Sequence, residues 1–420
     1  MPVFTSSIEL SDDYPSIQPS LNLNFAGSRA LDPHITFTRD SVGTYVDKNG
    51  LIKTAGEDEA RFDHDPETLE SLGLLIEEGR TNLIAYSVIN TANWNNSTST
   101  VTNNTTETKA PDGSNTAFKY VPDNGGIGWV SVYNTADVIN VISGTEYSYS
   151  IWAKPTHSDY TGFRINGDIR DNPGISISAN FVLSGDGSVS GTYDSASITK
   201  YPNGWYRCVA TATADATTTE EPGFQTTASG DGTKGFYAWG YQVEAGVFPT
   251  SYIPTSAAAV TRAVDTATIT GTSFSDFYNQ NEGTLVSFSR TLGVDLYQTA
   301  TFEFTSSNVN AELIGLEVTN SYNRFYVYGG GASASNYNYS VVSAGTLTKN
   351  ALAYKLNDVA GVRDGGTVFN DTSAGIPIPN IDRATIGYNF GYGNQKQQHI
   401  DRLLYYPKRL TDAQLQLLTS

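Results

Sequence analysis

The chain has 420 residues and carries 43 acidic against 25 basic side chains, a formal net charge of −18. Such a chain gains no counterion-release energy on a polyanion, so its charge argues against binding to nucleic acid. Its 39 glycines, 26 tyrosines and 18 phenylalanines are typical of short strands joined by tight turns. At about 150 residues per domain, the length predicts two or three domains.

The sequence shows no pattern of an export or membrane segment. Residues 1–10 have neither a basic stretch nor an apolar core, so we expect no Sec-type signal peptide and folding in a cytoplasm. No run approaches 18 apolar residues, so we expect no membrane insertion. A lone cysteine, Cys208, rules out an internal disulfide framework, and its place in an alternating run predicts a buried, inert thiol.

The first 85 residues divide into a polar arm and a small β region. Residues 1–20 are polar and contain two prolines, which predicts an extended arm. Further on, Asn49-Gly50 predicts a two-residue hairpin turn, because both positions tolerate positive φ. Residues 72–76 are an apolar stretch and are predicted to form another strand. Residues 21–85 are therefore expected to form a small β region.

Residues 86–255 are predicted to form a second unit. In residues 146–154 large apolar and small polar side chains alternate, and residues 204–213 and 236–244 repeat this pattern. A period of two predicts half-buried antiparallel strands, and short strands at this spacing predict a jelly-roll sandwich. The tryptophans within these strands are interpreted as core residues: Trp152, Trp205 and Trp239.

Residues 256–420 are predicted to form a third unit, which ends in a helix. Thr411 and Gln414 fit a capping box, and Leu410 and Leu415 occupy the hydrophobic-staple positions, so a helix of two turns is expected at the C-terminus. The predicted fold class is all-β. It consists of two consecutive antiparallel β-sandwich (jelly-roll) domains after the small N-terminal β region, with one short C-terminal helix.

Three ordered sets of residues are informative beyond their periodicity. The first contains residues 31–39, 43–45, 61–66 and 72–83. The second contains residues 203–208, 239–246 and 248–255, and the third is residues 401–411.

Together these stretches resemble a family of phage virion appendage proteins, which includes tail-fibre and head-fibre-like members. The resemblance implies a carbohydrate-binding-module-like sandwich over residues 86–255 and a concanavalin A-like or laminin-G-like sandwich over residues 256–420. It also implies that the N-terminal region, with the arm 1–20 and the β region 21–85, attaches the chain to other virion proteins. The location that it implies is the virion surface.

The usual catalytic patterns are missing from the sequence. There is no P-loop, no HExxH, no GxSxG and no EF-hand loop. Glu303 stands alone between two phenylalanines, so we see no pair of carboxylates on one strand face of the kind used in glycoside hydrolysis. We expect a non-enzymatic protein with no catalytic residues and no cofactor. No residue spacing indicates a metal site, including the structural calcium ion that many such sandwiches hold.

Sugar binding needs one or two aromatic faces and short polar side chains that hold hydroxyls. Aromatic and polar residues near glycines fit this description, although in the alternative interpretation these tyrosines only cap the sandwich edge. The candidates for contact with a glycan or a partner are Trp129, Tyr326, Tyr328, Asn336, Tyr337, Tyr339, Tyr388, Tyr392 and Asn394.

The leading hypothesis is a structural appendage or decoration protein of a tailed phage virion, which displays its sandwiches for adhesion to a host surface polysaccharide. The alternatives are a soluble glycan-binding adhesin and, with less support, a polysaccharide depolymerase. Phage appendages are commonly symmetric, so we expect a symmetric homo-oligomer such as a trimer.

Overall fold

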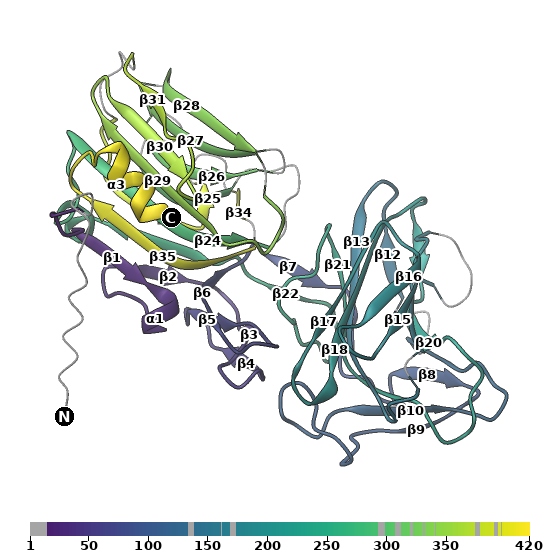
Figure 1. Cartoon of the computed structure of the whole chain (residues 1–420). Coiled ribbons are helices and arrows are strands. Elements are labelled where there is room, and N and C mark those ends of the chain that lie inside the picture. The colour runs from purple at the N-terminus through teal and green to yellow at the C-terminus, as the bar shows by residue number, and fades with distance from the viewer. Residues whose placement is uncertain are drawn as a thin grey trace, which may run out of the picture. The chain divides into compact units, whose positions relative to one another are not determined.

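A computed structural model gives the structure of the chain (Figure 1). It describes residues 15–132, 138–160, 162–168, 174–292, 299–306, 312–319, 322–330, 332–340, 342–373, 379–389, 394–395 and 397–420. These residues form antiparallel sheets with three short α-helices, α1 (Phe25–Ser28), α2 (Thr272–Ser275) and α3 (Asp412–Thr419). The predicted all-β class is confirmed. Among the described residues, no helix is long and apolar enough to cross a membrane.

By its internal contacts the chain divides into two compact units. The inserted unit consists of Arg39–Ser71 and Gly79–Val264. The C-terminal unit consists of Met1–Thr38, Leu72–Glu78 and Asp265–Ser420. The C-terminal unit is thus assembled from three separate segments of the sequence, and the inserted unit lies between them in the chain.

The inserted unit contains two six-stranded sheets. The first sheet is, in spatial order, β17 (Ser195–Lys200), β18 (Tyr206–Thr213), β13 (Glu146–Pro155), β21 (Phe236–Ala245), β10 (Phe118–Pro122) and β9 (Ser99–Thr102). The second sheet is β16 (Ser188–Thr192), β15 (Ser178–Val182), β14 (Gly162–Asn166), β20 (Gly223–Thr226), β11 (Trp129–Val132) and β8 (Trp94–Ser97).

The inner faces of these two sheets share one hydrophobic core. Tyr149 and Ile151 of the first sheet belong to the same buried cluster as Phe163 and Phe224 of the second. The ring of Phe163 lies 4.9 Å from that of Phe236 across the sandwich. Cys208 is in this cluster too, so its predicted buried position is confirmed, and burial raises the pKa of its thiol.

The outer face of the first sheet is aromatic and covered. Trp152 and Trp239 project from it and pack with Val46 and Ile52 of a hairpin formed by β3 (Gly43–Val46) and β4 (Ile52–Ala55). The indole rings of the two tryptophans lie 5.4 Å apart, edge to face. Trp152, Trp205 and Trp239 are all buried, as the alternating pattern predicted.

The predicted hairpin at Asn49-Gly50 exists, but its turn is longer than two residues. Val46 pairs with Ile52, so five residues form the loop, and of the two predicted turn residues Gly50 alone has a positive φ, of 74°. The carboxylate of Asp47 accepts the backbone N–H of Asn49, which holds the longer loop. The prediction of a two-residue turn was wrong because it ignored this Asp.

The C-terminal unit also contains two sheets. One is β31 (Phe369–Asp371), β30 (Val359–Arg363), β29 (Thr348–Lys355), β24 (Glu282–Thr291), β35 (Gln398–Tyr406) and β6 (Ser71–Ile76), and β1 (Leu21–Asn24) also pairs with β35. The other is the seven-stranded sheet β2 (Thr36–Thr38), β23 (Thr266–Thr270), β32 (Arg383–Ile386), β25 (Thr299–Thr305), β26 (Leu313–Val318), β27 (Tyr322–Gly329) and β28 (Ala332–Ser340).

The remaining elements are short. In the inserted unit they are β5 (Arg61–His64), the pairs β7 (Arg80–Asn82) with β22 (Val260–Arg262) and β12 (Ile139–Val141) with β19 (Thr218–Glu220), and the 3-10 turn η1 (Pro202–Gly204). In the C-terminal unit the further pair is β33 (Tyr388–Asn389) with β34 (Asn394–Gln395).

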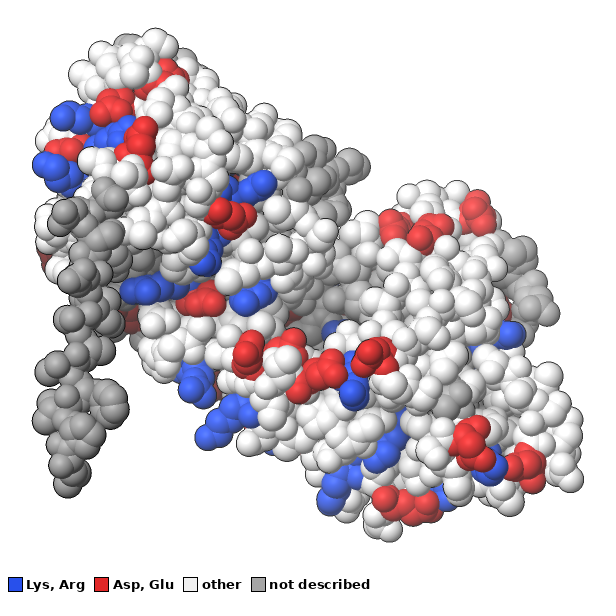
Figure 2. Space-filling model, in the orientation of Figure 1, with Lys and Arg blue, Asp and Glu red and all other residues white. Residues whose placement is uncertain are grey.

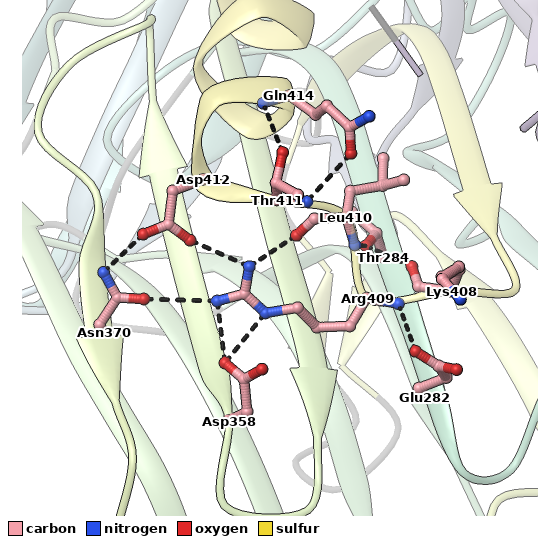
Figure 3. Close-up of polar contacts among 10 residues, drawn as sticks. All are labelled: Glu282, Thr284, Asp358, Asn370, Lys408, Arg409, Leu410, Thr411, Asp412 and Gln414. Atoms are coloured by element: carbon pink, nitrogen blue, oxygen red, sulfur yellow. Dashed lines mark hydrogen bonds and ion pairs between the residues drawn. The ribbon is translucent and has the colours of Figure 1, made fainter. Parts of the chain in front are cut away.

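The C-terminal helix α3 begins at the predicted capping box. Thr411 Oγ1 accepts the N–H of Gln414 at 3.3 Å, and the Gln414 side chain accepts the N–H of Thr411 at 3.0 Å (Figure 3). Just before the helix, the guanidinium of Arg409 bonds Asp358 and Asp412 at 2.9 Å each. The last residues of the stretch 401–411 therefore have a structural role, because they hold α3 against β30.

Candidate functional site

The outer face of the second sheet in the inserted unit is polar and carries one of the predicted residues, Trp129. Strand alternation sends Val130, Phe224 and Ile165 inward to the core, where each is completely buried. Their chain neighbours point outward. The strand register aligns six of these outward residues in one row across the whole sheet: Ser97, Trp129, Gln225, Arg164, Asn180 and Ser190.

We call these six residues the polar row. Because neighbouring strands lie about 4.8 Å apart, the polar row extends over roughly 24 Å. Each of its side chains is at least partly exposed. One guanidinium, two amides, two hydroxyls and one indole thus lie along a single line on a rigid sheet.

Trp129 is held at the first position of β11 by the glycines that precede it. The backbone at Gly128 is so close to Tyr120 that an added Cβ would lie 2.1 Å from the tyrosine Oη and 2.7 Å from the carbonyl oxygen of Thr98. At Gly126 an added Cβ would lie 2.2 Å from a methyl group of Thr98. The glycines therefore serve close packing, and Trp129 is half-buried on the sheet instead of projecting from a free loop.

Two hydrogen bonds fix polar side chains on this face. Arg164 Nε donates to Asn180 Oδ1 within the polar row, which orients the planar guanidinium along the sheet. Next to the row, the hydroxyl of Ser131 donates to a carboxylate oxygen of Glu221 at 2.7 Å. Preorganised groups of this kind lose little side-chain entropy when a ligand binds.

Asn166 lies on the same face with an unmet hydrogen-bond donor. Asn166 pairs with Gly223 on the neighbouring strand, and Gly223 in turn pairs with Ser131. These three residues form a parallel row, two residues along the strands from the polar row. Asn166 is 7% exposed, yet among the described residues its Nδ2 has no hydrogen-bond partner. An unpaired buried amide costs about 1–3 kcal/mol, so this donor marks a place where a bound acceptor group would be favourable.

The predicted residues of the C-terminal unit are placed less favourably for binding. Tyr326 is completely buried, and its hydroxyl donates a hydrogen bond to Glu303 on the outer face of β25. Burial and the nearby carboxylate raise the pKa of Tyr326 well above its ordinary value. The interpretation of Tyr326 as a contact residue was wrong, because the ring leaves no surface for a sugar.

The other aromatic candidates of this unit form two separate groups. Tyr328 is half-buried, and its hydroxyl accepts a hydrogen bond from Asn336 Nδ2 at 3.3 Å. Tyr337 is 40% exposed and stacks flat on Phe369, with ring centroids 4.4 Å apart. The hydroxyl of Tyr339 donates to backbone carbonyl oxygens, so this ring is held in place by structure.

Of the last three candidates, the structure places one side chain. Tyr388 is half-buried in β33, and burial together with the charge of Glu303 raises its pKa. Tyr392 lies outside the described residues. The backbone of Asn394 belongs to β34, but its side chain lies outside what the structure describes.

Sequence reasoning found Trp129 and missed the polar residues around it. Arg164 and Asn180 each lie between two apolar residues of a short alternating segment, and Gln225 lies between the buried Phe224 and Thr226. The same period of two that identified the larger strands would have placed them on one outward face. Their shared row could not have been read from the sequence, because it depends on strand order and register.

The charged side chains on the face drawn in Figure 2 are of mixed sign. On the face drawn in Figure 2, Lys and Arg side chains lie beside Asp and Glu side chains and do not gather into a basic patch. Within the described part of the chain, no group of three or more His, Cys, Asp or Glu is placed to hold a metal ion. The polar row offers hydrogen bonds and one aromatic surface, which is the chemistry that neutral hydroxyl-rich ligands need.

Comparisons with known proteins returned structural neighbours. No protein-family model matches the chain, and no curated protein matches it. The solved structures that are similar include the CBM40 module of the Ruminococcus gnavus IT-sialidase bound to alpha2,3 sialyllactose, at 15% identity and a TM-score of 0.29, covering 34% of this chain and 84% of that chain.

Two further similar structures are enzymes or parts of enzymes. Domain 4 of a GH43 extracellular arabinanase from Geobacillus stearothermophilus, in complex with arabinotriose, has 14% identity and a TM-score of 0.30, covering 37% of this chain and 73% of that chain. The Trypanosoma rangeli sialidase with the inhibitor DANA has 11% identity and a TM-score of 0.30, covering 72% of this chain and 60% of that chain. At these scores the similarities carry no argument about ligand or activity.

Proposed function

We propose that this chain is a non-enzymatic structural appendage or decoration protein of a tailed phage virion, and that it binds host surface polysaccharide through the polar row. The observation that carries the glycan part is the alignment of Trp129 with Gln225, Arg164 and Asn180 across one rigid sheet. The virion part is supported by the ordered sequence stretches that resemble phage appendage proteins.

In this proposal Trp129 provides the apolar surface, and the polar side chains orient the sugar by hydrogen bonds. The C–H groups of a sugar ring pack on the indole, and burying apolar area stabilises the complex by about 25 cal/mol per Å². The guanidinium of Arg164 and the amides of Gln225 and Asn166 hold hydroxyl or carbonyl oxygens. A single row of this kind gives modest affinity. Display of several copies on one particle raises the overall affinity.

A glycan array with the purified chain tests the site. We expect wild-type binding to a subset of bacterial surface glycans and at least a tenfold loss in Trp129→Ala. Tyr337→Ala removes the most exposed of the predicted aromatic residues that the structure describes in the C-terminal unit. It serves as the matched comparison, with binding expected to be unchanged. Loss of binding in Tyr337→Ala with retention in Trp129→Ala would move the site to the other unit and overturn the assignment.

Two further measurements test the rest of the proposal. Proteomics and cryo-EM of the purified particle should detect the chain on its surface, and its absence there would favour a soluble adhesin. A reducing-end assay on the bound polysaccharide should show no release above the protein-free control. Release of reducing ends would instead identify a depolymerase.

A further inference from the structure

The strand β28 is an unusually long free edge of the seven-stranded sheet in the C-terminal unit (Figure 1). It has nine residues, whereas the edge strands β2, β31, β8, β9, β16 and β17 have three to six. It pairs with β27 on one side and is the last strand in the sheet order. In the part of the chain that the structure describes, no strand pairs with its other side, which leaves a row of backbone N–H and C=O groups without strand partners.

From Ser335 to Ser340 this edge lacks the features that usually prevent pairing with another chain. Its one bulge lies before this segment, at Ala334, between the pairs Val327–Ser335 and Tyr328–Ser333. Natural edge strands are shortened, or they carry charges, proline or bulges. Residues 332–340 contain no charged residue and no proline, although the whole chain has a net charge of −18. One cation, Arg363, bonds Ser340 at the end of the strand. The middle of the strand is exposed and neutral at Asn336, Tyr337 and Asn338.

We propose that β28 pairs antiparallel with β28 of a second copy of this chain, so that the two seven-stranded sheets join edge to edge. In a two-fold antiparallel pair, residues near the axis lie opposite their own copies. A charged residue there would face a like charge, which is destabilising. A neutral segment of Asn, Tyr and Ser avoids this repulsion and allows side-chain contacts between identical strands.

The charge of the chain favours this edge as the place where two copies meet. Two copies of a molecule with a net charge of −18 repel each other, and a neutral edge is where they can approach with least cost. Pairing through β28 gives a dimer, or larger assemblies with two-fold axes. A trimer would need a different interface. The proposal does not depend on glycan binding, because the polar row belongs to the other unit.

The sharpest test uses engineered cysteines. The single native cysteine, Cys208, is completely buried, so an added exposed thiol reports on its own surroundings. Paired strands place opposite Cα atoms about 4.5–5.5 Å apart, which is within disulfide range. We expect Asn336→Cys or Asn338→Cys to form a covalent dimer under mild oxidation, and the better of the two to show the register. Ser197→Cys on the edge strand β17 is the matched control and should form no covalent dimer under the same oxidation.

Solution mass provides a second, independent measurement. Mass photometry or sedimentation velocity of the full chain should show a dimer in the wild type and in Ser197→Lys. Asn336→Lys places two like charges near the two-fold axis. It should raise the dissociation constant of the dimer at least tenfold and so shift the population to monomer. A monomeric wild type at micromolar concentration, or a dimer that Asn336→Lys leaves intact, would overturn the proposal.

Discussion

The two outer faces of the inserted sandwich each belong to a six-stranded sheet, but one face is covered and the other is open. On the first sheet, outward positions are filled by Trp152, Trp239 and Tyr237, and the β3–β4 hairpin packs over them. On the second sheet, the outward positions hold the polar row, with Trp129 as its one large aromatic side chain. The residues at alternate positions thus decide whether a face becomes a second core or stays available to a ligand.

The largest expected effect is on the covered face. Trp239→Ala removes a buried indole that packs on Trp152 and Tyr252 and should lower the free energy of unfolding by about 3–5 kcal/mol. Trp129→Ala on the open face should cost about 1 kcal/mol or less. Denaturant titration of both variants measures this contrast. Equal losses would mean that Trp129 is a core residue as well.

The second prediction concerns the glycines that place Trp129. Gly128→Ala adds a methyl group where the tyrosine hydroxyl and two carbonyl oxygens leave no room, and should destabilise the unit by about 1–3 kcal/mol. Because the displaced segment is the start of β11, glycan binding should fall in the same variant even when the protein remains folded. Gly125→Ala is the comparison, since no atom lies within 4 Å of the added Cβ. Its φ of 76° still introduces local strain, so circular dichroism should accompany both measurements.

The third prediction separates binding from stability on the open face. Asn166→Leu introduces an apolar side chain of similar size. It replaces a buried amide whose Nδ2 has no hydrogen-bond partner within the described part of the chain. No hydrogen bond of that donor is lost, so stability should stay within about 1 kcal/mol of the wild type. Glycan affinity should fall about tenfold, equivalent to about 1.4 kcal/mol, if the donor meets a ligand. Calorimetry with a glycan that binds in the array measures this affinity, and an unchanged affinity would remove Asn166 from the site.

The smallest effect is pH-dependent and lies at the rim of the covered face. Hydrogen bonds from Lys119 and Tyr237 lower the pKa of Glu107 below its ordinary 4.5. The carboxylate therefore contributes stability above pH 4.5, and this contribution disappears as the pH falls through the folded-state pKa. Glu107→Gln should flatten this part of the stability profile, with a change below about 1 kcal/mol because the carboxylate is largely exposed. A profile that keeps its slope would assign the effect to another acid.

Much of the fold was predictable because it depends on local rules. Alternation placed Tyr149 and Trp152 on opposite faces of β13, and the spacing of Thr411 and Gln414 identified the helix start. The candidate site was predicted at one residue, Trp129. Tyr326 was misjudged because the sequence does not show that Glu303 of β25 lies in the same row, with only Gly315 of β26 between them, and accepts a hydrogen bond from the tyrosine hydroxyl.

The interleaving of the two units also sets an order of events during synthesis. The strands β1 and β2 are made first, yet their partners β35 and β23 begin at Gln398 and Thr266. The inserted unit needs no residue after Val264. It can therefore fold on the ribosome while β1 and β2 wait unpaired, and the sandwich that includes the start of the chain is the last to close.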